Sequence, residues 1–155
     1  MYSLLVNVES ILNSRPFNPL SNDPNDMTPL TSVHSLVGKI FMDIPNPNVT
    51  HLPEGRVSIY QRLQQIPQHF WKRWSFDYII ELQQQVKWKA SQEKLQLGML
   101  VLVRDDNVPL LKWRLGRVMK LHTSKDGVNR VATIKIADSV LKRCFSKLCP
   151  FPMSE

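Results

Sequence analysis

The chain has 155 residues, and its 20 basic and 13 acidic side chains give a formal net charge of +7. Its two cysteines, Cys144 and Cys149, have no histidine beside them, which argues against a disulfide framework or a zinc site and fits the reducing interior of a cell. The sequence has no long apolar stretch and no basic leader with a cleavage site, so it predicts neither a membrane span nor a signal peptide.

The charge is distributed unevenly along the chain. Residues 1–55 carry two basic and five acidic side chains, whereas residues 56–155 carry 18 basic and eight acidic ones. A basic segment that also holds all four tryptophans is typical of a protein that binds a phosphate backbone. Net charge describes solubility and non-specific attraction equally well, so composition alone leaves nucleic-acid binding open.

Residues 1–15 are expected to form one short amphipathic helix. Their apolar side chains share the spacing of one helical face: Leu4, Leu5, Val8, Ile11 and Leu12. The helix must end near Arg15, because Pro16 follows. The favoured reading is a remnant of a domain whose remainder is missing, since the next segment offers this helix nothing to cover. The alternative is docking onto a long helix further along the chain.

Residues 16–55 are expected to form a proline-rich linker. Seven of the 11 prolines lie here: Pro16, Pro19, Pro24, Pro29, Pro45, Pro47 and Pro53. Proline lacks the backbone N–H that helices and central strands require, so the segment should be mostly extended or looped.

Residues 56–93 are expected to form a long amphipathic helix. Its apolar residues recur at steps of three and four: Ile59, Leu63, Ile66, Phe70, Trp74, Tyr78, Leu82 and Val86. Pro67 predicts a kink or a break around residues 63–66. The stripe is too long for a small sheet domain to cover, which predicts self-association or contact with a partner domain.

The segment His69–Trp74 (HFWKRW) interleaves aromatic and basic side chains. Single-stranded nucleic-acid binders use such mixtures for stacking and phosphate contacts. On a helix the favoured reading is a core role for Phe70 and Trp74, with Lys72 and Arg73 in solvent.

Residues 94–152 carry the pattern of a small antiparallel β-barrel. We expect strands at 100–103, 111–118, 130–136 and 140–143, with a tight turn at 124–127. In the second strand Leu111, Trp113 and Leu115 alternate with Lys112 and Arg114, and a bend at Gly116 would return Val118 to the buried face. The expected fold class is therefore α+β: a helix, a proline-rich linker, a long kinked helix and an SH3-like barrel.

No catalytic or metal-binding constellation stands out. Asp105 and Asp106 precede Asn107 and fit a turn better than an acid pair. The four histidines are scattered without ligand spacing, so we expect no metal site.

Several motifs follow one another along the chain. They are Val8–Pro16 (VESILNSRP), Asn22–Asp26 (NDPND), His69–Trp74 (HFWKRW), Leu111–Val118 (LKWRLGRV) and Lys147–Pro150 (KLCP). This combination resembles the tail of BEL/Pao-type retrotransposon polyproteins, where the end of the integrase core is followed by the integrase C-terminal domain. The resemblance covers about residue 3 to Pro152.

The resemblance implies a module without catalytic residues or cofactors. Residues 1–15 would be the last helix of the integrase core, and the barrel would bind DNA. The family's metal-binding carboxylates belong to core segments that this chain does not contain, and Glu9 is not one of them. The long helix would then serve self-association or contact with the integrase core.

The expected partner is DNA, bound without sequence specificity and, for a functional protein, inside the nucleus. The candidate contacts to phosphates are basic side chains of the barrel: Lys112, Arg114, Arg117, Lys142, Arg143 and Lys147. The alternative is a protein-interaction or chromatin-associated module of a decayed or host-retained element copy.

Overall fold

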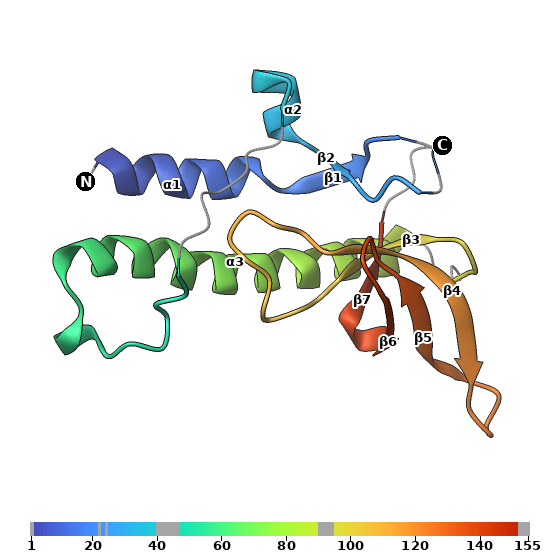
Figure 1. Cartoon of the computed structure of the whole chain (residues 1–155). Helices are drawn as coiled ribbons and strands as arrows, with labels where there is room; N and C mark the ends of the chain where they lie inside the picture. Colours follow the sequence, from blue (N-terminus) through green and yellow to red (C-terminus); the bar gives the residue numbers. More distant parts are fainter. Residues whose placement is uncertain (1, 22, 24, 40–46, 90–94, 152–155) are drawn as a thin grey trace.

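The computed structural model describes residues 2–21, 23, 25–39, 47–89 and 95–151, apart from the side chains of residues 85–89. Within these residues the fold has three α-helices, a two-stranded antiparallel sheet and a five-stranded antiparallel sheet. Figure 1 shows the larger sheet beside the C-terminal half of the long helix α3 (Ile59–Lys89). The predicted α+β class is therefore confirmed.

The N-terminal helix α1 (Tyr2–Asn13) packs against α3 and runs beside it (Figure 1). Its residue Ile11 is completely buried. Just after the helix, the carbonyl oxygen of Pro16 accepts a 2.7 Å hydrogen bond from the hydroxyl of Tyr78 in α3. The alternative expectation, docking of this helix onto the long helix, is therefore what the structure shows.

Where it is described, the proline-rich segment is mostly extended or looped, as expected, but it also contains short regular elements. Strand β1 (Pro16–Pro19) pairs antiparallel with β2 (Pro29–Thr31), and the short helix α2 (Ser32–Val37) follows. The prolines of this hairpin stand at the ends of its two strands, where a missing N–H disturbs the ladder least. A 3-10 turn, η1 (Glu54–Arg56), precedes α3.

A kink or a break was expected around residues 63–66, but helix α3 continues through Pro67 without a break. Two glutamine side chains beside the proline tie the helix to the segment before it. Gln65 Nε2 donates to the carbonyl oxygens of Val49 (3.2 Å) and Leu52 (2.8 Å), and Gln68 Oε1 accepts from the Val49 N–H at 3.0 Å. These contacts hold the helix in place where proline removes one of its own hydrogen bonds. None of the helices in the described part of the chain is both long and apolar enough to cross a membrane.

The larger sheet has the strand order β6-β5-β4-β3-β7 and is not closed into a barrel among the described residues. Its strands are β3 (Leu100–Val103), β4 (Leu115–Thr123), β5 (Asn129–Lys135), β6 (Val140–Cys144) and β7 (Leu148–Pro150). A 3-10 turn, η2 (Phe145–Lys147), leads from one edge strand to the other. The expected strands near 100–103, 130–136 and 140–143 are confirmed, and β7 was not expected.

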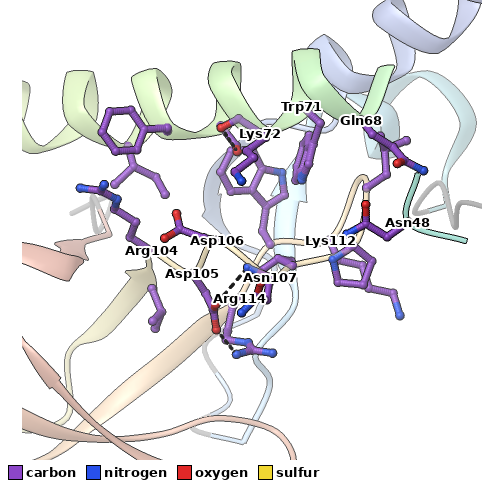
Figure 2. Close-up of a pocket in the computed structure, with 18 of the residues that line it drawn as sticks. Asn48, Gln68, Trp71, Lys72, Arg104, Asp105, Asp106, Asn107, Lys112 and Arg114 are labelled. Atoms are coloured by element: carbon purple, nitrogen blue, oxygen red, sulfur yellow. Dashed lines mark hydrogen bonds and ion pairs between the residues drawn. The ribbon is translucent and has the colours of Figure 1, made fainter. Parts of the chain in front are cut away.

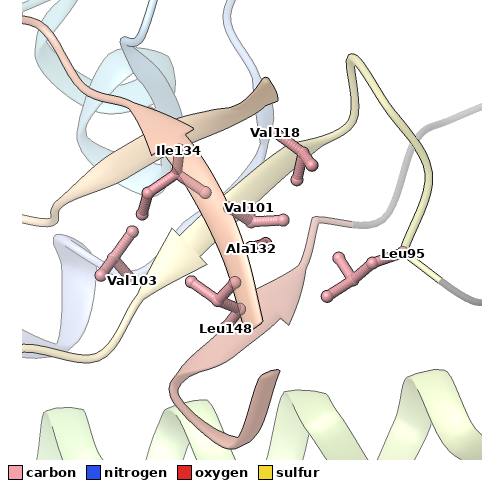
Figure 3. Packing of buried hydrophobic residues seen from close by; sticks show 7 residues of the cluster. All are labelled: Leu95, Val101, Val103, Val118, Ala132, Ile134 and Leu148. Atoms are coloured by element: carbon pink, nitrogen blue, oxygen red, sulfur yellow. The ribbon is translucent and has the colours of Figure 1, made fainter. Parts of the chain in front are cut away.

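The strand β3 is buried on both faces, because the sheet has a core on each side. Facing α3 is the helix-facing cluster: Ile79, Leu100, Leu102, Leu115, Cys149 and Phe151. On the other face is the inner cluster, shown in Figure 3: Leu95, Val101, Val103, Val118, Ala132, Ile134 and Leu148. Gln83 of α3 adds a hydrogen bond to the Leu148 carbonyl oxygen at 3.1 Å. Helix and sheet thus share one of the two cores.

Strand β4 begins later than the alternation predicted. Residues 104–114 form a loop instead of the start of a strand, and Leu111 adopts a left-handed φ of 63° that breaks the extended conformation. Trp113 packs against aromatic residues of α3, and this tertiary contact outweighs the local alternation of apolar and basic residues that predicted a strand.

The expected bend at Gly116 is also wrong. The irregularity in the β4–β5 ladder lies between Val118 and Lys120, and Val118 belongs to the inner cluster, opposite the face of Leu115. Glycine serves close packing here, because a Cβ at position 116 would lie 3.2 Å from Ile136 Cγ2. The turn predicted at 124–127 is confirmed, with Gly127 at a φ of 78°.

Four aromatic rings join α3 to the loop before β4. Trp113 meets the rings of Trp71, Trp74 and Tyr78 edge-on, with centroids 5.0, 5.9 and 5.5 Å away. Its buried Nε1–H has no hydrogen-bond partner among the described residues. Of the two rings expected in a core, Trp74 belongs to this cluster and is half-buried, whereas Phe70 is half-buried outside it. Lys72 and Arg73 are exposed as expected, and the most buried ring of the segment 69–74 is that of Trp71.

Candidate functional site

The faces of β4, β5 and β6 can be assigned from burial and register. Ala132 and Ile134 of β5 are buried in the inner cluster, so Thr133 and Lys135 point to the opposite face. Residues directly opposite in an antiparallel ladder share a face. Thr133 stands between Lys120 of β4 and Lys142 of β6.

This face carries four basic side chains on three neighbouring strands. They are Arg117, Lys120, Lys135 and Lys142, and we call them the outer cationic face. The strands β4, β5 and β6 contain no aspartate or glutamate. The sheet therefore presents positive charge without a compensating carboxylate from its own strands.

His122 lies on this face, and its pKa responds to the charges there. Its Nε2 atom is 2.8 Å from the hydroxyl oxygen of Thr133 on β5. Desolvation lowers the pKa of His122, and the positive charges of Lys142 and Lys120 lower it further. Desolvation first, and then the lysines that make the face cationic, therefore favour the neutral form of the imidazole.

The arrangement places like charges side by side. Arg117 stands directly opposite Lys135, and Lys120 and Lys142 flank Thr133 from the two neighbouring strands. Like charges directly opposite in a sheet destabilise it. Arg117 also donates to the Gly98 carbonyl oxygen at 2.7 Å, which fixes its guanidinium group at the end of the row. A bound polyanion would relieve the repulsion between the side chains of this face.

The six basic residues expected to touch phosphates do not form one surface. Only Arg117 and Lys142 lie on the outer cationic face. Arg143 belongs to the row of Ala132, on the inner side of the sheet. Lys147 is exposed in η2.

The two remaining candidates lie in the loop before β4. Arg114 forms an ion pair with Asp105, and Lys112 is exposed beside a cavity against α3. Lys112 and Arg114 were expected on one face of a strand, but strand β4 begins after them.

Lys120 and Lys135 were not among the expected contact residues, because the prediction considered the alternation of side chains within each strand and not the pairing between strands. The irregularity between Val118 and Lys120 changes which residues of β4 face outward, and the local sequence does not mark it. A signal was nevertheless present: the segments 115–123, 129–135 and 140–144 are basic and lack acidic residues.

The described residues contain no cluster of three histidine, cysteine or acidic side chains that could hold a metal ion. Cys144 is exposed and Cys149 is buried in the helix-facing cluster, where burial raises the pKa of the Cys149 thiol to about 12. A thiol held neutral in this way is a packing group.

Comparisons with known proteins identify a family for most of this structure. The sequence profile of a family described as "Family of unknown function (DUF5641)" matches residues 58–151. Neither a comparison with curated proteins nor one with solved structures gave a match. The matched segment begins just before α3 and ends just after β7, so it comprises the long helix and the larger sheet with their shared core. The match covers more than half of the chain, which therefore belongs to the DUF5641 family of unknown function.

Proposed function

We propose that this chain is a non-catalytic module that binds nucleic acid through the outer cationic face. The observation that carries the proposal is the set of four basic side chains on three adjacent strands that contain no carboxylate. Such a surface attracts a phosphate backbone and releases its counterions, which is the main source of sequence-independent affinity. The preferred partner is DNA, and the place of action is the nucleus.

The resemblance to the C-terminal part of BEL/Pao-type integrases supports the same function from the sequence. In this proposal the five short antiparallel strands, with η2 joining the two edge strands, are an open variant of an SH3-like barrel. The catalytic carboxylates of an integrase would belong to a separate part of that protein. The module would then position DNA without cutting or joining it.

The arrangement of the cations predicts contacts to phosphates and not to bases. Lysine and arginine side chains that stand above a sheet reach backbone oxygens, whereas base reading requires an element that enters a groove. We therefore expect similar affinities for duplexes of unrelated sequence.

The proposal is tested by comparing two triple variants of equal charge. Lys120→Ala, Lys135→Ala and Lys142→Ala together remove three cations of the outer cationic face. Lys39→Ala, Arg56→Ala and Arg62→Ala together remove three exposed cations of the helical part. Fluorescence anisotropy with a labelled DNA duplex should show a loss of about tenfold or more for the first variant and a much smaller loss for the second. Equal losses would show that only net charge matters.

A second candidate function, protein interaction, is supported by exposed apolar side chains on the adjoining helices α1 and α3. Tyr2 and Leu5 of α1 are 85% and 63% exposed, and Ile59 and Tyr60 of α3 are 84% and 70% exposed. Such a surface would serve self-association or contact with an integrase core. Sedimentation equilibrium of the whole chain and of the Leu5→Asp, Ile59→Asp variant tests self-association. A monomer at every concentration would leave contact with another protein as the remaining form of this candidate.

A further inference from the structure

A cavity lies between α3 and the loop 104–114, apart from the outer cationic face. Its volume is about 300 Å³, at the lower end of the range of small-molecule sites, which is about 300–1,000 Å³. Figure 2 shows Trp71 and Lys72 projecting from α3 toward the loop that carries Asn107 and Lys112. One wall is therefore a rigid helix and the other a loop.

Part of the cavity lining is aromatic and aliphatic. Trp71 and Trp113 line it, and their rings meet edge-on at 5.0 Å within the cluster that joins α3 to the loop. Ile79, Val108 and Leu110 are among the other apolar residues of this lining. Flat indole rings fixed by their neighbours can receive a planar apolar ligand with little loss of side-chain entropy.

The cavity is lined by four basic side chains and by two carboxylates, Asp105 and Asp106. Arg104 and Arg114 are already engaged, one over the Phe76 ring at 3.8 Å from its centroid and the other in the ion pair with Asp105. Lys72 and Lys112 are exposed at the opening, and among the described residues neither forms an ion pair. Two ammonium groups thus stand where an anionic group of a ligand could reach them.

We propose that this cavity binds one unpaired nucleotide of a single-stranded nucleic acid. The base would lie against the indole rings of Trp71 and Trp113, and its phosphate would lie between the ammonium groups of Lys72 and Lys112. Aromatic side chains that stack bases, combined with lysines that track the backbone, are how single strands are bound without sequence preference. A simple anion would not use the aromatic wall, and a purely apolar ligand would not use the lysines.

This inference rests on the proposed function, because the nucleotide would belong to the nucleic acid that the chain binds. Duplex DNA keeps its bases paired and stacked, so it can reach the outer cationic face but cannot insert a base into the cavity. A single-stranded end or a frayed duplex can do both. Duplex and single-strand affinity should therefore respond to different substitutions.

The experiment measures affinity for two probes, a duplex and a single strand of about ten nucleotides that carries one 2-aminopurine. Lys72→Ala is compared with Arg73→Ala, which removes the same charge from the next residue of α3 but does not line the cavity. We expect Lys72→Ala to weaken single-strand binding about threefold to fivefold more than Arg73→Ala does, the size of an exposed ion pair. The two variants should bind the duplex equally.

A second variant, Val108→Trp, fills the cavity without changing the charge. We expect it to lower single-strand affinity about fivefold or more, the size of one lost stacking contact, and to leave duplex affinity unchanged. The 2-aminopurine fluorescence, which base stacking quenches, should lose its response to the protein. Thermal unfolding checks that Val108→Trp folds. If it does not fold, the comparison of Lys72→Ala with Arg73→Ala tests the nucleotide site alone.

The outcomes separate this inference from the proposed function. Duplex binding that depends on the outer cationic face, with no effect of Lys72→Ala or Val108→Trp on the single strand, would overturn the nucleotide site alone. Single-strand binding lost in Val108→Trp, with duplex binding indifferent to Lys120, Lys135 and Lys142, would overturn the proposed face and retain the cavity site. Equal single-strand affinities of all variants and the unmodified chain would also overturn the inference.

Discussion

At the scale of residues, Tyr78 connects parts of the chain that are far apart in sequence. Its hydroxyl donates to the Pro16 carbonyl oxygen, and its ring stacks on Trp74 at 5.5 Å while meeting Trp113 edge-on. Burial raises the pKa of Tyr78 to about 12. The side chain is thus held neutral in a position where ionisation would break its hydrogen bond.

The stability of the fold should fall at alkaline pH because of this tyrosine. An unfolded tyrosine loses its proton near a pH of about 10, whereas the folded one keeps it until about 12. Between these values the unfolded chain binds fewer protons, so the free energy of unfolding decreases as pH rises. Below a pH of about 10 this contribution is fully present.

Urea unfolding across this pH range measures the effect. Tyr78→Phe should show a shallower decrease, and near neutral pH it should be less stable by about 1 kcal/mol because one hydrogen bond is lost. Tyr60→Phe is the matched control, since Tyr60 is 70% exposed on the same helix. Identical pH profiles for the two variants would show that Tyr78 is not the group that titrates.

The imidazole of His122 provides a second test at this scale. Lys142→Ala should raise the pKa of His122, because one of the charges that lower it is removed. Lys147→Ala, an exposed lysine outside that set of causes, should leave the pKa of His122 unchanged. An NMR titration of the imidazole resonances separates the two variants. A His122 pKa indifferent to Lys142 would mean that the face is less compact than the register indicates.

At the scale of elements, α3 organises the molecule. It carries α1 along one side, the segment around Val49 through Gln65 and Gln68, and the sheet through Ile79. The family match begins with this helix, and the sheet would lose one wall of its helix-facing cluster without it. Residues 58–151 should therefore fold as a unit, whereas residues 94–152 alone should not.

Substitutions within α3 test this dependence. Ile79→Ala should lower the free energy of unfolding by about 2–4 kcal/mol, the cost of truncating a buried isoleucine. Ile66→Ala, on the same helix but 43% exposed, should cost much less. Urea unfolding of both variants gives the comparison. Similar costs at the two positions would mean that the sheet is stable without its helical cover.

The elements with strong local signals could be predicted from the sequence. Strand β3 was expected at 100–103, and the turn before β5 was marked by Asp126 and Gly127. The hairpin of β1 and β2 was not predicted, because both of its strands contain prolines. The late start of β4 and the strand β7 were not predicted either, because each depends on a partner distant in sequence. The start of β4 is an example. The alternating residues 111–115 are not all extended, because Leu111 has a positive φ and Trp113 packs against the aromatic rings of α3.

At the scale of the whole molecule, basic and apolar surfaces lie on different elements. The exposed apolar side chains of α1 and of the start of α3 belong to the helical layer, whereas the outer cationic face belongs to the sheet at the other half of α3 (Figure 1). The uneven charge of the sequence predicted that one part of the chain is basic. Which basic side chains lie side by side follows only from the register of three strands. Lys142 was among the contact residues expected from the sequence. Lys120 and Lys135 could be assigned to the same face only from the strand register.

The salt dependence of duplex binding tests this account most directly. Each neutralised phosphate contributes about 0.9 to the slope of log K against log salt. Replacing Lys120, Lys135 and Lys142 by alanine should therefore reduce the magnitude of that slope by about two to three, while the variant lacking Lys39, Arg56 and Arg62 keeps it. A folded outer-face variant with the same slope as the unmodified chain would contradict the assignment of this face as the nucleic-acid interface.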